Sequence, residues 1–599
     1  MSRRFALVAF EFGRFQLDEP SRVLRLGGRE IPLQPRIFDL LLYLVRNRTR
    51  VISKDELLDA LWPGVTVTEG SLQRAVSVLR AILREGGMEE AVRSFPRIGY
   101  RFSADADAQG SEHKEGAADH EWGSLPTARS AAAKQQWEEA VALYAEAGDA
   151  STLEGPDLDV WGLALQCLGR PADAVPILIR AVSAHRQVGK IDAAAAGAVA
   201  LSSIHLERGQ TAVAKGWLAR ARDLVASQPE SVEAGRICWM ESRIAAAEGD
   251  PHRALELAEA AYAFGQSRGI LDIEALGLMY RGFFRLSLGD TKAGLADQDH
   301  AAALALSSKI DPITGGVLYC NILWACRTFG DWARANQWTI GYQQFCAASR
   351  MGFSGACQLH RAEVLGIGGS LREALAHVKD ALSRLSSDAP WAVGDGYRVL
   401  GDVLAAMGDT DAALAAYDKA YALGWDPEPG HAMLLLERGE AEAAYVSLER
   451  SLIGQSWWTL QRQGMLLAHL ALVAAHAGRL ERSQALIDDL AGQAERWPMP
   501  SIRALTNEAS ALLAQTRGEP EEALRRLHLA RQLWTSIDSR FHAAQLRLQI
   551  AALQLELGDA SGAAAEVRAA CAAGEDLDSD KLRLACQAMR HRLAQLDAT

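Results

Sequence analysis

The chain has 599 residues, too many for one compact core, and a formal net charge of −12, so at least two structural units are expected. Hydrophobic residues make up 49% and aromatic residues only 7%, a composition that favours packed helices over a β-sandwich. The sequence contains no apolar run of about 18 residues, and Phe5–Phe10 is too short for a secretion signal, which excludes membrane and secreted classes and predicts a cytoplasmic protein.

The charge is unevenly distributed along the chain. Residues 1–103 contain 17 Lys and Arg against 12 Asp and Glu, a net of +5, and the remainder contains 46 against 63, a net of −17. Basic side chains attract the phosphates of nucleic acids. We therefore expect the first hundred residues to contact double-stranded DNA, and the acidic remainder to serve another purpose.

The first elements have the alternation of short strands. Phe12–Asp18, Val23–Leu26 and Glu30–Leu33 are strand-like pieces between turn residues, and Gly27–Gly28 fits a tight hairpin. These pieces predict a small antiparallel sheet at the start of the chain.

Three helices are predicted after this sheet. Pro35–Arg46 has apolar residues at helical spacing and a proline in its first turn, where the missing N–H is tolerated. Residues 53–62 begin with Ser53 as the expected cap and Glu56 as the return acceptor of a capping box. The third helix covers Ser71–Arg84.

The third helix has one apolar and one basic face. We expect it to bury Leu72, Ala75, Val76, Leu79, Ile82 and Leu83. The opposite face carries Gln73, Arg74, Ser77, Arg80, Ala81 and Arg84. Such a face suits the major groove, because Arg pairs with guanine and Gln with adenine. After the helix, residues 92–102 predict two strands around a turn, with Arg97 at a tip that fits an adjacent minor groove.

Residues 10–103 resemble the OmpR/PhoB-type winged-helix domain. The resemblance is carried by Ile52–Leu57, Leu61–Gly64, Ser71–Leu72 with Leu79–Arg80, and Gly99–Phe102. It implies that the third helix and the wing bind DNA, often as head-to-tail dimers. By position it places DNA contacts at Ser71, Gln73, Arg74, Ser77 and Arg80 on the helix, and at Arg97 and Arg101 on the wing.

Some features of the resemblance leave alternatives open. Arg74 and Arg80 also fit a plain solvated helix face, and Arg80 suits a phosphate as well as a base edge. The sequence contains no receiver domain, so control by aspartyl phosphate is not expected. The loop Trp62–Thr68 is short, which leaves a contact with RNA polymerase open, and Trp62 itself is interpreted as a core residue.

Residues 104–124 are polar, lack apolar periodicity and are interpreted as a linker. Beyond the linker, a glycine followed by a polar residue and an amphipathic helix recurs at intervals of 40, 40, 40, 41, 39, 39, 31, 39, 40 and 40 residues. The glycines are Gly169, Gly209, Gly249, Gly289, Gly330, Gly369, Gly408, Gly439, Gly478, Gly518 and Gly558. Each glycine is expected to cap the first helix of a pair, which predicts stacked helix pairs over 125–599.

This region resembles tetratricopeptide-type repeats of the longer, 40-residue kind found in MalT and LuxR-like bacterial regulators. The stretches that carry the resemblance are Leu318–Asn321, Gly330–Trp332, His360–Glu363 and Asp426–Gly430. The resemblance implies a regulatory role and an unknown protein or small-molecule effector. The predicted fold is therefore an α+β winged helix at residues 1–103, followed by an all-α, tetratricopeptide-like superhelical solenoid of eleven to twelve helix pairs.

One interval between marker glycines is shorter than the others. Between Gly408 and Gly439, the sequence Gly424–Gly430 contains two prolines, which cannot lie inside a helix. The interpretation is a shortened, irregular repeat near 424–439, and the alternative is a hinge or a ligand-facing loop.

Aromatic residues gather in about one repeat. Their main expected role is to lock neighbouring repeats together, and the alternative is a groove for a ligand or partner. The candidate groove residues are Trp324, Trp332, Trp338 and Tyr342. Tyr319, Phe345 and Phe353 lie in the same stretch, with Cys320, Cys326 and Cys346.

The sequence gives no motif for catalysis or for a cofactor. Its eight cysteines form no C-x-x-C pair, its 14 histidines are dispersed, and it has neither a phosphate-binding loop nor a nucleophile elbow. We therefore predict no metal, no cofactor and no enzyme. The leading hypothesis is a sequence-specific, DNA-binding transcription regulator that dimerises on DNA, and the alternative is a protein-interaction scaffold with non-specific DNA binding.

Overall fold

The structure is a computed structural model, and the chain divides into two units, Met1–Ala118 and Asp119–Thr599. It describes residues 9–12, 14–18, 22–31, 33–48, 52–61, 69–88, 91–95, 99–102, 106–108, 124–147, 153–228, 230–306, 309–352, 354–453 and 457–597. Across these ranges, every helix is too short or too polar to cross a lipid bilayer.

The first unit begins with an antiparallel sheet in the strand order β4-β3-β2-β1-β8. Its strands are β1 Ala9–Phe12, β2 Phe15–Asp18, β3 Val23–Leu26, β4 Arg29–Ile31 and β8 Ala106–Ala108. The prediction of one strand over 12–18 was wrong, because the chain reverses here and Phe12 pairs with Phe15. Strand β8 comes from the segment interpreted as linker and extends the sheet by pairing with β1.

Three helices and a second sheet complete this unit. The helices are α1 Pro35–Arg46, α2 Lys54–Leu61 and α3 Glu69–Glu85, and the sheet joins β5 Ile52–Ser53, β7 Gly99–Phe102 and β6 Val92–Phe95 in that order. Ser53 ends β5 directly before α2, and Glu56 accepts a hydrogen bond of 2.9 Å from the Tyr43 hydroxyl. Leu41 and Leu79 are fully buried in the common core. The predicted winged-helix fold is confirmed.

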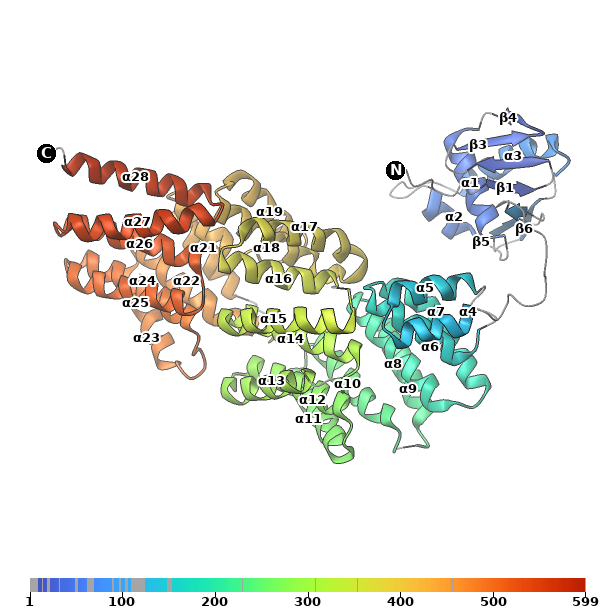
Figure 1. The fold of residues 1–599 in the computed structure, drawn as a ribbon, viewed down its shortest axis with the longest axis horizontal. Helices are drawn as coiled ribbons and strands as arrows, with labels where there is room; N and C mark the ends of the chain where they lie inside the picture. Colours follow the sequence, from blue (N-terminus) through green and yellow to red (C-terminus); the bar gives the residue numbers. More distant parts are fainter. Residues whose placement is uncertain are drawn as a thin grey trace. The chain divides into compact units, whose positions relative to one another are not determined.

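The second unit is a solenoid of helices in which each helix packs against the next along the chain (Figure 1). In the described residues it has twelve consecutive pairs, α4–α5 to α26–α27, and a last helix α28. The first six pairs are α4 Ser124–Ala133, α5 Trp137–Glu146, α6 Gly155–Cys167, α7 Pro171–Gln187, α8 Ile191–Glu207, α9 Thr211–Val225, α10 Val232–Ala247, α11 Pro251–Arg268, α12 Leu271–Leu288, α13 Thr291–Ala305, α14 Pro312–Phe329 and α15 Trp332–Ser349. The rest are α16 Gly355–Gly368, α17 Leu371–Asp388, α18 Val393–Met407, α19 Thr410–Ala422, α20 Gly430–Glu437, α21 Ala441–Leu452, α22 Gln463–His476, α23 Leu480–Gly492, α24 Pro500–Thr516, α25 Pro520–Ser536, α26 Arg540–Glu556, α27 Ala560–Asp576 and α28 Asp580–Asp597, with short 3₁₀ turns η1 Pro390–Ala392 and η2 Trp457–Arg462.

The glycines that mark the repeat end the first helix of every pair from α6–α7 to α26–α27. All eleven have positive φ, between +70° and +101°, a backbone conformation that favours glycine. At Gly330, for example, its N–H donates to the Arg327 carbonyl and the N–H of Asp331 donates to the Cys326 carbonyl, at 3.2 and 2.8 Å. These two hydrogen bonds satisfy carbonyl groups that would otherwise lack a partner at the helix end. The helical solenoid predicted from the glycine spacing is confirmed.

The short interval contains a short helix. Helix α19 ends at Ala422 and α20, of eight residues, begins only at Gly430. Pro427 and Pro429 lie in the connection between them. The repeat near 424–439 is therefore complete as a helix pair but has a shortened first helix.

Consecutive turns of the solenoid contact each other along a seam. The hydroxyls of Ser501, Ser539 and Ser579 donate to the carbonyls of Gly330, Ile367 and Ala406, at 2.7, 3.2 and 2.6 Å. Each carbonyl lies at the C-terminal end of a first helix, at α14, α16 or α18, where intrahelical partners are lacking. These bonds join residues about 170 positions apart, so the C-terminal repeats curl back onto the middle of the solenoid.

Candidate DNA-binding surface and candidate ligand cavity

Helix α3 carries the predicted DNA-facing side chains on its exposed face. Leu72, Ala75, Val76, Leu79 and Leu83 are buried, and Ile82 is half-buried. Gln73, Arg74, Ser77, Ala81 and Arg84 are exposed, and Ser71 lies in the first turn of the helix. The apolar face therefore fixes the helix in the core and directs the polar face outward.

Arg74 and Arg80 differ in their surroundings. Within the described residues Arg74 makes no hydrogen bond or ion pair, so its guanidinium is available to a ligand. The Arg80 guanidinium donates to the Val92 carbonyl at 2.7 and 3.0 Å and to the Ser94 hydroxyl at 2.8 Å. Arg80 thus ties α3 to strand β6, which orients the helix relative to the wing and leaves less of its donor capacity for DNA.

The wing is the hairpin of β6 and β7. Arg101 is half-buried on β7 and pairs across the hairpin with the exposed Arg93. The predicted tip residue Arg97 lies outside the described residues, as does Trp62. Arg93 and Arg101, on adjacent strands, give this hairpin a positive charge. The hairpin lies beside α3, because Arg80 of that helix bonds the first strand, β6.

Comparison with known proteins places this unit in a family. Residues 28–102 match the family described as "Transcriptional regulatory protein, C terminal". The N-terminal unit carries an OmpR/PhoB-type winged-helix domain. The resemblance predicted from the sequence is thereby confirmed for this unit.

Individual relatives match the same part of the chain. The transcriptional activator CadC of Escherichia coli (strain K12) is 33% identical over 77 residues, which are 12% of this chain and 15% of CadC. The phosphate regulon regulatory protein PhoB of Rhizobium meliloti (strain 1021) is 32% identical over 89 residues, 15% of this chain and 39% of PhoB. The solved DNA-binding domain of CadC is 24% identical, covers 17% of this chain and all of that domain, and has a TM-score of 0.16. The match thus spans less than half the length of the full-length CadC and PhoB proteins.

The candidate groove aromatics fall into two groups. Trp324 and Trp332 line a cavity in the second unit. Trp338 and Tyr342 do not line it but pack on Tyr319, with ring centroids 6.1 and 5.3 Å from the Tyr319 ring. These ring contacts, between α14 and α15, fit the main expected role of packing and not the alternative of a groove.

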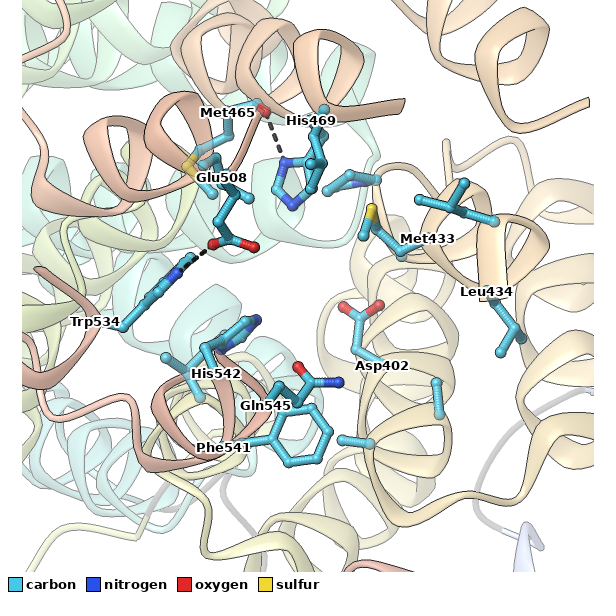
Figure 2. Close-up of a pocket in the computed structure, with 18 of the residues that line it drawn as sticks. Asp402, Met433, Leu434, Met465, His469, Glu508, Trp534, Phe541, His542 and Gln545 are labelled. Atoms are coloured by element: carbon cyan, nitrogen blue, oxygen red, sulfur yellow. Dashed lines mark hydrogen bonds between the residues drawn. The ribbon is translucent and has the colours of Figure 1, made fainter. Parts of the chain in front are cut away.

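The cavity has a volume of about 750 Å³ and is lined by helices from α14 to α28. Many of its side chains are apolar, such as Met433, Leu434, Met465 and Phe541 (Figure 2). Its volume is in the range of cavities that hold small organic molecules. The seam described above holds its two sides together.

One wall of the cavity holds a network of paired charges. Arg398 bonds Glu363 at 2.9 and 3.0 Å, Asp395 at 2.8 Å and Asp402 at 2.8 Å. Arg327 adds a bond of 3.0 Å to Asp395. Burial opposes the charge on Asp395, but the two arginines outweigh it and hold its pKa below the usual range. Burial raises the pKa of Asp402 to about 6 despite its contact with Arg398.

The facing wall holds a carboxyl group without a cation. Glu508 on α24 accepts a hydrogen bond of 2.7 Å from the Trp534 indole N–H, and burial raises its pKa to about 7. His469 on α22 and His542 on α26 lie nearby (Figure 2), and burial lowers their pKa values to about 4 and about 3. Both imidazoles are therefore neutral near neutral pH.

The sequence interpretation did not select these cavity residues. They lie between positions 327 and 542 and meet only because the solenoid curls back. The sequence contains one weak signal of these residues, their shared position in the repeat. Arg398 and Glu508 lie ten residues before a marker glycine, and His469 lies nine residues before one. Among the described residues, no group of three His, Cys, Asp or Glu is placed to hold a metal ion.

Proposed function

We propose that this protein is a sequence-specific, DNA-binding transcription regulator that reads the major groove with α3. The observation that carries the proposal is the exposed face of α3, with Gln73 and Arg74, on a winged-helix domain of a regulatory family. The net positive charge of residues 1–103 supports the same surface, because it attracts DNA phosphates.

The second unit is the regulatory module in this proposal. It binds an unknown effector, protein or small molecule, and its cavity is the place that suits a small molecule. Binding of the effector would change transcription by altering dimerisation on DNA or a contact with RNA polymerase. The chain acts within the cytoplasm in this account and performs no catalysis.

The variant Arg74→Ala tests the assigned face of α3. Loss of a bidentate Arg contact to a base costs about 1 to 3 kcal/mol on the specific site, which is about 5- to 150-fold in affinity. Fluorescence anisotropy with a labelled duplex selected by the full-length protein measures this change. Affinity for unrelated DNA should fall much less, because phosphate contacts supply most of it.

Arg29→Ala is the matched control. Arg29 is exposed on β4 and its loss removes the same single charge from the same unit. We expect it to leave the preference for the selected site unchanged. Equal affinities of wild type and Arg74→Ala for that site would contradict the proposed orientation, and weak, salt-sensitive binding to every sequence would favour the scaffold alternative.

A further inference from the structure

The cavity of the second unit offers hydrogen-bond acceptors on the wall formed by α22, α24 and α26. Glu508, His469, His542 and Gln545 surround the same open space there (Figure 2). They come from three repeats that are consecutive in the chain, so the wall is built by the regular stacking of first helices. Their chemistry decides which ligand the wall can hold.

Glu508 is the strongest acceptor on this wall. In the described part of the chain it forms no ion pair, and its hydrogen-bond partner, the Trp534 indole, is neutral and bonds one carboxylate oxygen. A half-buried carboxylate without a cation is destabilised by the loss of water around it, which is why its pKa is raised to about 7. A cation that enters the cavity would remove this penalty.

His469 is also an acceptor toward the cavity. Its Nδ1 lies 2.8 Å from the Met465 carbonyl oxygen, which can only accept, so Nδ1 carries the ring hydrogen. Because the ring is neutral, Nε2 has a free lone pair, and Figure 2 shows the ring directed into the open space. A ligand group that faces His469 Nε2 is therefore a hydrogen-bond donor.

The paired charges of the opposite wall do not compete for this ligand group. Arg398 is fully engaged with Glu363, Asp395 and Asp402, and Lys581 forms an ion pair with Glu437. Nη1 of Arg327 has no partner in the described residues but is itself buried, so it offers no open donor to this ligand group. On the opposite wall each of these carboxylates is paired with an arginine or a lysine, whereas Glu508 has no cationic partner in the described residues.

We propose that this cavity binds a small organic amine, with Glu508 as the counter-ion of its ammonium group, His469 as a second acceptor, and Met433, Leu434, Met465 and Phe541 around its apolar body. The volume of about 750 Å³ exceeds that of a bare ammonium or inorganic ion and suits an organic molecule. The regulatory role of the amine rests on the proposed function. Binding of the amine in the cavity does not depend on DNA recognition.

The test uses three probes with the same indole body and different charge, namely tryptamine, tryptophol and indole-3-acetate, titrated into the full-length protein by calorimetry. Tryptamine should have an affinity advantage of about 10-fold or more over tryptophol, because its ammonium group forms a hydrogen bond to a charged partner. Indole-3-acetate should bind weakest. The variant Glu508→Gln should remove that advantage and leave tryptophol affinity within about 3-fold. The control Glu521→Gln, on the exposed first turn of α25, should bind all three probes as wild type does.

Thermal unfolding without ligand gives a second, independent readout. The raised pKa of Glu508 means that its ionised form opposes folding, and this penalty is complete above about pH 7 and shrinks as the carboxyl protonates in the folded state. Glu508→Gln should therefore raise the melting temperature at about pH 8 and raise it less at about pH 5.

The outcomes separate this inference from the proposed function. Binding of tryptamine that is absent, no tighter than that of tryptophol, or unaffected by Glu508→Gln would overturn the amine site, and so would a lower melting temperature of that variant at about pH 8. Specific DNA binding would stand in each of those cases. Loss of DNA specificity with an intact amine site would instead overturn the proposed function alone.

Discussion

Replacement of Arg398 by Met is expected to lower the free energy of unfolding of the second unit by about 3 to 5 kcal/mol. Arg398 is 10% exposed and pairs with three carboxylates, Glu363, Asp395 and Asp402, on α16 and α18. Without it, Arg327 still pairs with Glu363 and Asp395, but Asp402 loses its paired cation. Removing one partner of a buried ion pair leaves uncompensated charge, which is why the effect is large.

Denaturant unfolding followed by circular dichroism measures this effect. Arg372→Met is the control, because Arg372 is 80% exposed and forms one surface ion pair with Asp578, a kind of pair that contributes about 0 to 1 kcal/mol. Arg398→Met should also lose more stability at neutral than at acidic pH, since acid protonates the orphaned carboxyls. Equal unfolding midpoints for the two variants would contradict the charge network.

The variant Gly369→Ala is expected to destabilise the same unit by about 2 to 5 kcal/mol, by two separate effects. Gly369 has φ +94°, where a side chain is strained by about 1 to 2 kcal/mol. An added Cβ would also lie 2.3 Å from the Cδ2 of Leu577, a fully buried residue of the next turn of the solenoid. Overpacking of this kind typically adds about 1 to 3 kcal/mol.

Gly518→Ala separates the two effects. Gly518 has φ +75° and the same place in its repeat, but an added Cβ would meet no atom within 4 Å. Its variant should therefore lose only the backbone contribution of about 1 to 2 kcal/mol in the same unfolding measurement. Equal losses at Gly369 and Gly518 would mean that the seam at Leu577 is not closely packed.

The fold could be predicted where a periodic pattern repeats. The spacing of marker glycines predicted the helix pairs because each glycine occupies a helix end that requires positive φ, and α1 was predicted with its observed bounds from its apolar period. Strand β8 was missed because Ala106–Ala108 has no apolar alternation and is held at a sheet edge by β1 alone. The hairpin of β1 and β2 was missed because its turn interrupts a sequence that otherwise alternates.

The sites were less accessible to sequence reasoning. The exposed face of α3 follows from helical period, so Gln73 and Arg74 could be selected. The contact of Arg80 with strand β6 is tertiary and leaves no mark in the local pattern. The polar cavity residues are separated by up to 215 positions, between Arg327 and His542, and only the superhelical curl of the solenoid brings them together.

The most direct test of the central claim is selection of genomic DNA fragments by the purified full-length protein at about 150 mM salt, with Arg74→Ala in parallel. Wild type is expected to recover fragments with one shared motif, as a direct repeat of half-sites about one helical turn apart. Arg74→Ala should lose that enrichment. Recovery of unrelated fragments by wild type, or of the same motif by Arg74→Ala, would contradict recognition of DNA by α3.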